Sequence, residues 1–135
     1  MIFADIYITP VQADRKAAYL DFSKKVAAVY REHGALRVVD CWQAEDEGEQ
    51  TDFHAAGARE EYESGAPLPD FRRAAGARPG ETVVVSWVEW PSREARDKGL
   101  AAATADPRIQ PQPGEEAIFD GRRLIAGGFS MELDG

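Results

Sequence analysis

The chain has 135 residues, of which 44% are hydrophobic and 30% are charged, and this size and balance are typical of one soluble globular domain. The formal net charge of −8 argues against a nucleic-acid-binding protein, which normally carries a basic footprint, and no apolar run approaches the roughly 18 residues of a membrane span. The single cysteine, Cys41, excludes an internal disulfide. The N-terminus lacks the pattern of a signal peptide, so we expect a cytoplasmic protein.

Six elements are predicted in chain order from hydrophobic periodicity and breaker residues. They are strand 1–8, helix 13–34, strand 35–43, strand 81–90, helix 93–105 and strand 122–133. Pro10 is expected to end the first strand, Gly34 to close the first helix and Ser92 to cap the second. Gly127 and Gly128 in the last strand indicate a bulge or a close backbone approach.

This order of elements predicts an α+β fold of the ferredoxin-like type, with an antiparallel four-stranded sheet that carries both helices on one face. Both faces of the sheet are expected to be buried, because both phases of the middle strands are apolar. One phase is assigned Val38, Trp42, Val85 and Trp87, and the other Val39, Cys41, Val84 and Val88. Two helices cover only one face, so a second copy is expected to cover the other and form a homodimer.

The charge imbalance lies in one segment. Residues 43–70 hold nine acids and one base, a net charge of −8, while the rest of the chain holds 15 acids and 15 bases. Within the segment, TDFHAAGAR at 51–59 resembles PDFRRAAGAR at 69–78, which indicates a partial duplication. We interpret residues 46–69 as an acidic inserted loop and regard the second copy as the original, because it runs unbroken into the next strand.

A candidate pocket follows if the phase of Trp42 and Trp87 faces away from the helices. Strict alternation then brings three carboxylates, a phenol and two indoles to one surface. The residues of this candidate pocket are Asp5, Tyr7, Asp40, Trp42, Trp87 and Glu89. Desolvated acids could transfer protons near neutral pH, and indoles could stack on a flat ligand. The alternative is structural, with the acids paired to arginines across a dimer interface.

A candidate anion clamp consists of Arg108, Arg122 and Arg123, which stand among turn-forming residues in DPRI and FDGRR. The alternative is that these motifs are simply a helix stop and a turn. No metal or cofactor is expected, because Cys41 and His54 have no partners at the spacing of metal ligands.

Several motifs in combination resemble the YbaA-like bacterial family of unknown function (DUF1428), which belongs to the dimeric α+β barrel superfamily. They are GALRVVDCW, DFRRA with ARPGETVVVSWVEWPSREARD, DPRI and FDGRRLIAGGF, and they span nearly the whole chain outside the acidic segment. The resemblance implies two ferredoxin-like sheets packed face to face, and it implies no established activity. Members carry a single TDF motif at this place, so the duplication departs from the family pattern.

The sequence supports two hypotheses about function. It does not indicate whether the protein is an enzyme. The first is a homodimer that binds a small organic molecule, with or without cofactor-independent catalysis. The second is a non-enzymatic stress or protein-interaction module that uses the acidic loop. An enclosed cavity lined by the candidate pocket would favour the first hypothesis, and a filled barrel with a protruding loop would favour the second.

Overall fold

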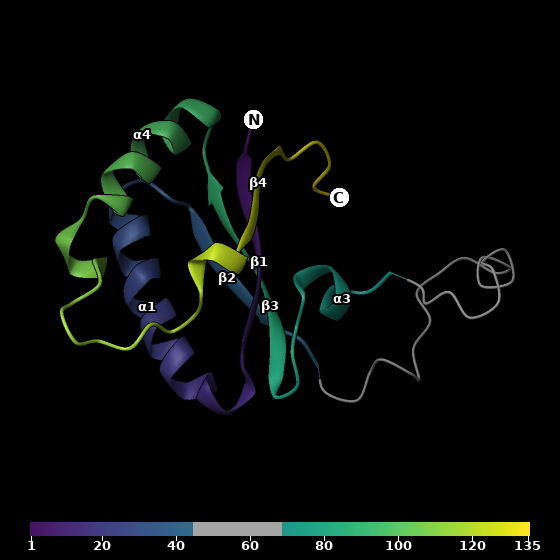
Figure 1. Ribbon diagram of the computed structural model, residues 1–135. Coiled ribbons are helices and arrows are strands. Elements are labelled where there is room, and N and C mark those ends of the chain that lie inside the picture. Colours follow the sequence, from purple (N-terminus) through teal and green to yellow (C-terminus); the bar gives the residue numbers. More distant parts are fainter. Residues whose placement is uncertain (45–68) are drawn as a thin grey trace, which may run out of the picture.

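Figure 1 shows the computed structural model of the chain, which describes residues 1–44 and 69–135. The strands are β1 (Phe3–Gln12), β2 (Arg37–Trp42), β3 (Glu81–Trp90) and β4 (Ile125–Ser130). The α-helices are α1 (Lys16–Glu32), α3 (Phe71–Ala75) and α4 (Arg93–Thr104), and the short 3-10 helices are η1 (Ala13–Arg15), η2 (Pro107–Ile109) and η3 (Gly121–Arg123). Apart from Pro69, the predicted acidic loop falls outside the described residues, and so does the hypothesis that it binds a partner.

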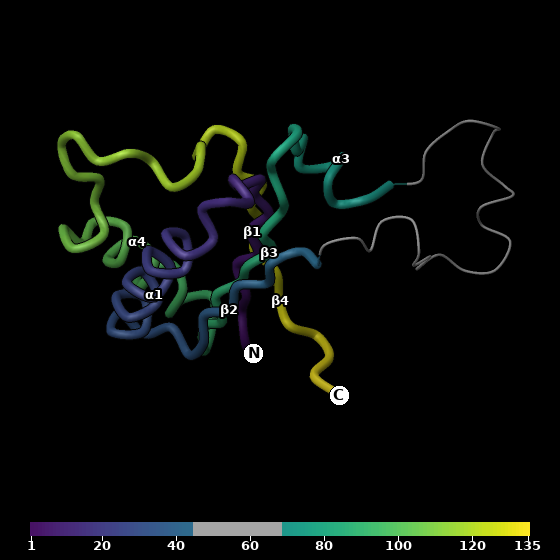
Figure 2. The backbone as a smooth tube through the Cα atoms, turned by 90° about the horizontal axis from the view of Figure 1, so that it is seen from below, coloured from purple at the N-terminus to yellow at the C-terminus, as the bar shows by residue number. Residues whose placement is uncertain are grey.

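The four strands form one antiparallel sheet in the order β2-β3-β1-β4, with β1 in the interior. The helices α1 and α4 lie on one face of this sheet, and the short helix α3 lies on the other (Figures 1 and 2). An α+β fold with a four-stranded antiparallel sheet and both long helices on one face was predicted, and it is confirmed. We call the two sides the helix face and the open face.

Strand β1 continues past Pro10 to Gln12, so the prediction that Pro10 ends it is wrong. The amide of Ala13 donates to the carbonyl of Gly80, and alternation along the ladder then points the Pro10 nitrogen toward β4. Pairing with β4 stops at Ile8, so no ladder partner is lost where proline lacks its N–H.

Helix α3 was not predicted, although its ends carry recognisable signals. The carboxylate of Asp70 accepts a hydrogen bond from the amide of Arg73, and Gly76 closes the helix in the left-handed conformation. Five residues are too few for hydrophobic periodicity to reveal. None of the helices in the described ranges is both long and apolar enough to cross a membrane.

The helix face holds a tightly packed core. Trp90 and Val84 are fully buried, and the Trp90 indole packs against Tyr30 of α1 with 6.1 Å between ring centroids. A Cβ atom on Gly99 of α4 would overlap both the Trp90 ring and the backbone oxygen of His33, so glycine is needed for this close approach. Gly99 therefore sets how closely α4 packs on the sheet.

The expected strand phases of β2 and β3 are wrong by one residue. Val38 pairs with Val88 and Trp42 with Val84, so the even-numbered residues of both strands share the helix face. Odd-numbered β3 residues, including Val85 and Trp87, lie on the open face instead. The last strand pairs with β1 without a bulge, and Gly128 sits against the Phe3 ring, which confirms a close approach there.

Candidate functional site

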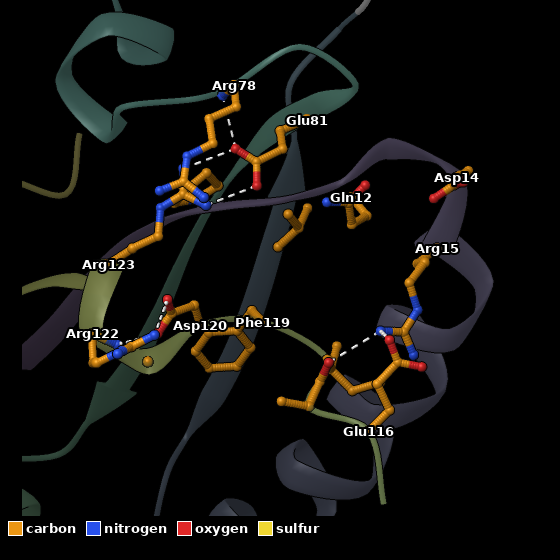
Figure 3. A pocket seen from close by; sticks show the side chains of 15 residues that line it. Gln12, Asp14, Arg15, Arg78, Glu81, Glu116, Phe119, Asp120, Arg122 and Arg123 are labelled. Atoms are coloured by element: carbon orange, nitrogen blue, oxygen red, sulfur yellow. Dashed lines mark hydrogen bonds and ion pairs between the residues drawn. The ribbon is translucent and has the colours of Figure 1, made fainter.

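A cavity of about 750 Å³ opens at one end of the sheet (Figure 3). Its walls come from the end of β1, from η1, from the turn before β3, and from residues 116–123, which lead into and include η3. Four arginines line it: Arg15, Arg78, Arg122 and Arg123. Four carboxylates, Asp14, Glu81, Glu116 and Asp120, accompany them. We call this cavity the arginine pocket.

The pair Glu81 and Arg123 forms one wall of the arginine pocket. Two nitrogens of the Arg123 guanidinium each donate to a different Glu81 carboxylate oxygen at 2.8 Å, and one of them also donates to the carbonyl of Gly76 at 2.7 Å. The amide of Arg78 donates a further bond to Glu81. Hydrogen bonds from Arg123, followed by the Arg78 amide, lower the pKa of Glu81 to about 2, against the opposing effect of burial. This wall is rigid and ionised at neutral pH.

Asp120 and Arg122 form a second pair beside the first. The Arg122 guanidinium donates two bonds to the Asp120 carboxylate at 3.1 Å, and the Arg122 amide donates a third at 3.0 Å. These bonds hold the pKa of Asp120 below its usual range. The Arg122 side chain is 91% exposed, so this pair contributes little to stability and can open at small cost.

Arg15 stands on the other side of the pocket (Figure 3). Its guanidinium donates to the carbonyl of Ala117 at 3.1 Å and lies 3.6 Å from the exposed carboxylate of Glu116. Between the two sides lies Phe119, whose ring packs against Tyr19 and Phe22 of α1. The segment before η3 is therefore anchored on the core and supplies an apolar floor to a cavity with charged sides.

The six residues of the predicted candidate pocket do not share one surface, so that expectation is wrong. Asp5, Tyr7, Asp40 and Trp42 lie on the helix face, whereas Trp87 and Glu89 lie on the open face. The cause is the one-residue difference in phase between β2 and β3, because each step along a strand turns the side chain to the opposite face.

The helix-face members are buried by α1 and α4 rather than gathered around a ligand. The Asp5 carboxylate accepts a hydrogen bond from the Trp90 indole at 3.1 Å and lies 3.6 Å from Arg96. Burial raises the pKa of Asp5, and burial also raises the pKa of Tyr7. Asp40 accepts a hydrogen bond from Ser23 of α1. These contacts are those of a packed core.

Trp42 and the two open-face members also have partners. Trp42 packs edge to face against Tyr19, with 5.8 Å between ring centroids. On the open face the Trp87 indole donates to Glu89 at 2.9 Å, and Arg37 lies 3.8 Å from the same carboxylate. The sequence-based alternative paired these acids with arginines across a dimer interface, and within one chain Asp5 lies near Arg96 and Glu89 near Arg37.

The predicted anion clamp is split. Arg122 and Arg123 line the arginine pocket together, but Arg108 does not. Arg108 donates to Asp106 at 2.7 Å and to Glu32, at the last residue of α1, at 2.6 Å. Arg15 immediately precedes α1, and a helix of this length spans about 25 Å, so Arg108 sits at the far end of the helix from the pocket.

Among the described residues, no cysteine or histidine lines the arginine pocket. Cys41 is exposed on the open face, and His54 lies outside the described residues. His33 pairs with Asp106 at 3.1 Å. Within residues 1–44 and 69–135, no group of three or more His, Cys, Asp and Glu side chains is arranged to hold a metal ion.

Sequence reasoning missed Arg15, Arg78 and Glu81 as pocket residues. A usable signal existed for Glu81 and Arg123. Both β3 and β4 run antiparallel to β1, so they begin at the same end of the sheet, where β1 ends. Glu81 is the first residue of β3, and Arg123 stands two residues before β4. The predicted order of elements alone would have brought these opposite charges together.

Comparison with known proteins gives two findings. The family described as "Protein of unknown function (DUF1428)" matches residues 2–121. The chain is also 37% identical over 135 residues to the "Uncharacterized protein YbaA" of Escherichia coli strain K12, and the match covers 99% of each chain. The YbaA proteins of Escherichia coli O157:H7 and Shigella flexneri match with the same identity and coverage.

Proposed function

Since the chain belongs to the DUF1428 family, whose function is unknown, we propose a function from the site: the protein binds a small organic anion in the arginine pocket. The volume of about 750 Å³ lies within the range of pockets that hold small molecules. Phe119 adds an apolar contact surface to a lining that holds four arginines and four carboxylates.

The observation that carries this proposal is a surplus of hydrogen-bond donors over acceptors on the side of the pocket where η3 meets the turn before β3, whereas Asp14 and Glu116 lie on the other side, beside Arg15. A carboxylate has about four acceptor positions, and Glu81 and Asp120 each already accept three hydrogen bonds. A guanidinium has about five N–H donors, of which Arg123 uses three and Arg122 two. Among the described residues no hydrogen bond from the Arg78 side chain is found. The unused capacity favours a ligand that accepts, namely an anion.

The test is a ligand screen read by native mass spectrometry and by thermal shift, using neutral, cationic and anionic compounds. We expect anionic compounds to bind, and Arg122→Gln to weaken them about tenfold, the loss of one charge-assisted hydrogen-bond pair. Arg31→Gln is the matched control, because Arg31 is an exposed arginine near the distant end of α1. Binding that prefers neutral or cationic compounds, or that is unaffected by Arg122→Gln, would contradict the proposal.

The proposal also includes the fold type and the oligomeric state of the protein. We propose that the fold is ferredoxin-like and that two copies pack their open faces together as a dimeric α+β barrel. The strand order and the placement of both long helices on one face support the first part. Ile125 and Phe129 of β4, which are 44% and 52% exposed, support the second, because apolar side chains on a sheet face favour burial. We further propose a cytoplasmic location, which fits the free thiol of Cys41.

Sedimentation velocity at micromolar concentration tests the dimer. We expect the wild type to sediment as a dimer and Phe129→Asp to shift toward monomer, because the new carboxylate would be buried without a partner. Leu133→Asp serves as the control, since Leu133 is 86% exposed and lies beyond β4. A wild-type protein that stays monomeric would refute the dimer while leaving the pocket proposal to its own test.

A further inference from the structure

The guanidinium groups of the arginine pocket fall into two separate sets. Arg78, Arg122 and Arg123 gather on one side, where η3 and the turn before β3 meet (Figure 3). Arg15 stands alone on the opposite side, next to the segment that carries Glu116. Because the two sets lie on opposite sides of the cavity and a hydrogen bond reaches only about 3 Å, a ligand that contacts both sets needs an accepting group at each end.

The surface between the two sets includes apolar side chains together with Gln12. The side chain of Phe119 lies between them in Figure 3, and Val11 and Ile118 also line the cavity. Val11 belongs to a buried cluster with Tyr19 and Val84, against which Ile118 and Phe119 pack. A ligand that spans the pocket therefore meets charge at both ends and hydrocarbon in the middle.

The two ends differ in how firmly they are held. Arg123 is fixed by Glu81 and by the Gly76 carbonyl, and its side chain is only 18% exposed. Arg15 is also partly buried, and its hydrogen bond to the Ala117 carbonyl uses only one of its five N–H donors. Both ends thus present oriented donors before a ligand arrives, which reduces the entropy lost on binding.

From this arrangement we propose that the ligand is an organic dianion, with one carboxylate or similar group at each end of an apolar spacer. One end is bound by Arg122 and Arg123, with Arg78 beside them, and the other end by Arg15. Glu81 is a positioning residue, because it acts on the ligand only through Arg123. The inference rests on the proposed function and adds the number and placement of the charges.

The experiment compares dicarboxylates with their matched monoacids and diamides by isothermal titration calorimetry at low ionic strength. The probes are pentanedioate, hexanedioate, octanedioate and benzene-1,4-dicarboxylate, each with the monoacid and diamide of the same length, together with inorganic phosphate. We expect one dicarboxylate to bind at least about tenfold more tightly than its monoacid, since its second carboxylate gains one further charge-assisted contact.

Two variants of Arg15 test whether this residue binds the second anionic group of the ligand. Arg15→Gln should remove the advantage of the diacid and leave the affinity for the monoacid nearly unchanged, whereas Arg15→Lys should keep part of it. Glu116→Gln should act in the opposite direction, because it removes the carboxylate that competes for Arg15 and is 83% exposed. Thermal unfolding of each variant shows whether the fold is kept, and Arg31→Gln again serves as the control.

The outcomes separate the two proposals. A diacid advantage that depends on Arg15 supports the dianion. Diacids that bind no better than monoacids, or an advantage that survives in Arg15→Gln, would overturn the dianion and leave anion binding in place. If none of the probes binds and the broader screen finds no anion, the proposed function fails and the dianion with it.

Discussion

The two faces of the sheet differ in how completely their side chains are buried. On the helix face, Trp90 and Val84 are fully buried, and the buried Asp5 carboxylate has a hydrogen-bond donor within the same chain. On the open face, Phe129 and Ile125 are about half exposed, although α3 covers one end. The first face is packed as the interior of a domain. The second leaves apolar side chains half exposed, which is the feature on which the proposed dimer rests.

The largest effect is expected on the helix face. Trp90→Ala should cost about 4 kcal/mol of unfolding free energy, because a large and fully buried side chain leaves a cavity behind. Phe129→Ala on the open face should cost less. Urea unfolding at several protein concentrations sharpens the contrast, since only the loss at Phe129 should grow with concentration if that face is buried between copies. A concentration-independent loss at both positions would remove the distinction.

The close approach of α4 to the helix face gives the second effect. Gly99→Ala should destabilise the protein by about 2 kcal/mol, because the new methyl group would overlap Trp90 and the backbone of His33. Alanine is the better helix former, so an exposed helix position would respond in the opposite direction. Ala102→Gly, at an exposed position of the same helix, is the matched control. Unchanged or increased thermal stability of Gly99→Ala would show that α4 can shift without cost.

Glu81 gives an effect of similar size with a defined pH window. Glu81→Gln should cost about 2 kcal/mol at pH 7, because it weakens the bonds to Arg123. The pKa of Glu81 is lowered to about 2 in the folded protein, from an ordinary value near 4.5. Its contribution is therefore complete above about pH 4.5 and disappears as the pH falls through 2. Denaturant unfolding of both proteins between pH 2 and 7 should show the difference closing at the acid end.

Asp5 is expected to behave in the opposite sense and with the smallest effect. Burial raises its pKa above 3.8, so the folded state favours the protonated acid and loses stability relative to Asp5→Asn as the pH rises above that value. The asparagine keeps an oxygen to accept the bond from Trp90. A stability difference between the two proteins that does not change between pH 3 and 7 would mean that Arg96 fully compensates for the burial.

The elements could be predicted well where the signals were local. The strand 81–90 agrees with β3 at both ends, Ser92 caps α4 through a bond from Ala95, and Gly34 adopts a positive φ after α1. The relative phase of β2 and β3 could not be predicted. A tight hairpin fixes register through its turn, whereas here the connection runs from residue 43 to residue 80 and imposes none.

The candidate site shows the same limit. Arg122 and Arg123 could be named from their turn motif alone. Arg15 and Arg78 could not, because they lie far apart in the sequence and come to line one pocket only when the sheet is assembled. Alternation within a strand located Asp40 beside Trp42, but it could not say that Trp87 would face the other way. The sequence indicates which charged or aromatic side chains one element carries. It does not indicate which elements bring such side chains together.

The strand order has a consequence for how the protein folds. Of the four strands, β1 is made first and becomes an interior strand, yet its neighbours in the sheet are β3 and β4 and not β2. The hydrogen bonds between β1 and β3 can therefore all form only after the chain has been synthesised through Trp90. Such non-local pairing slows folding and leaves an apolar strand unpaired while the rest of the chain is made.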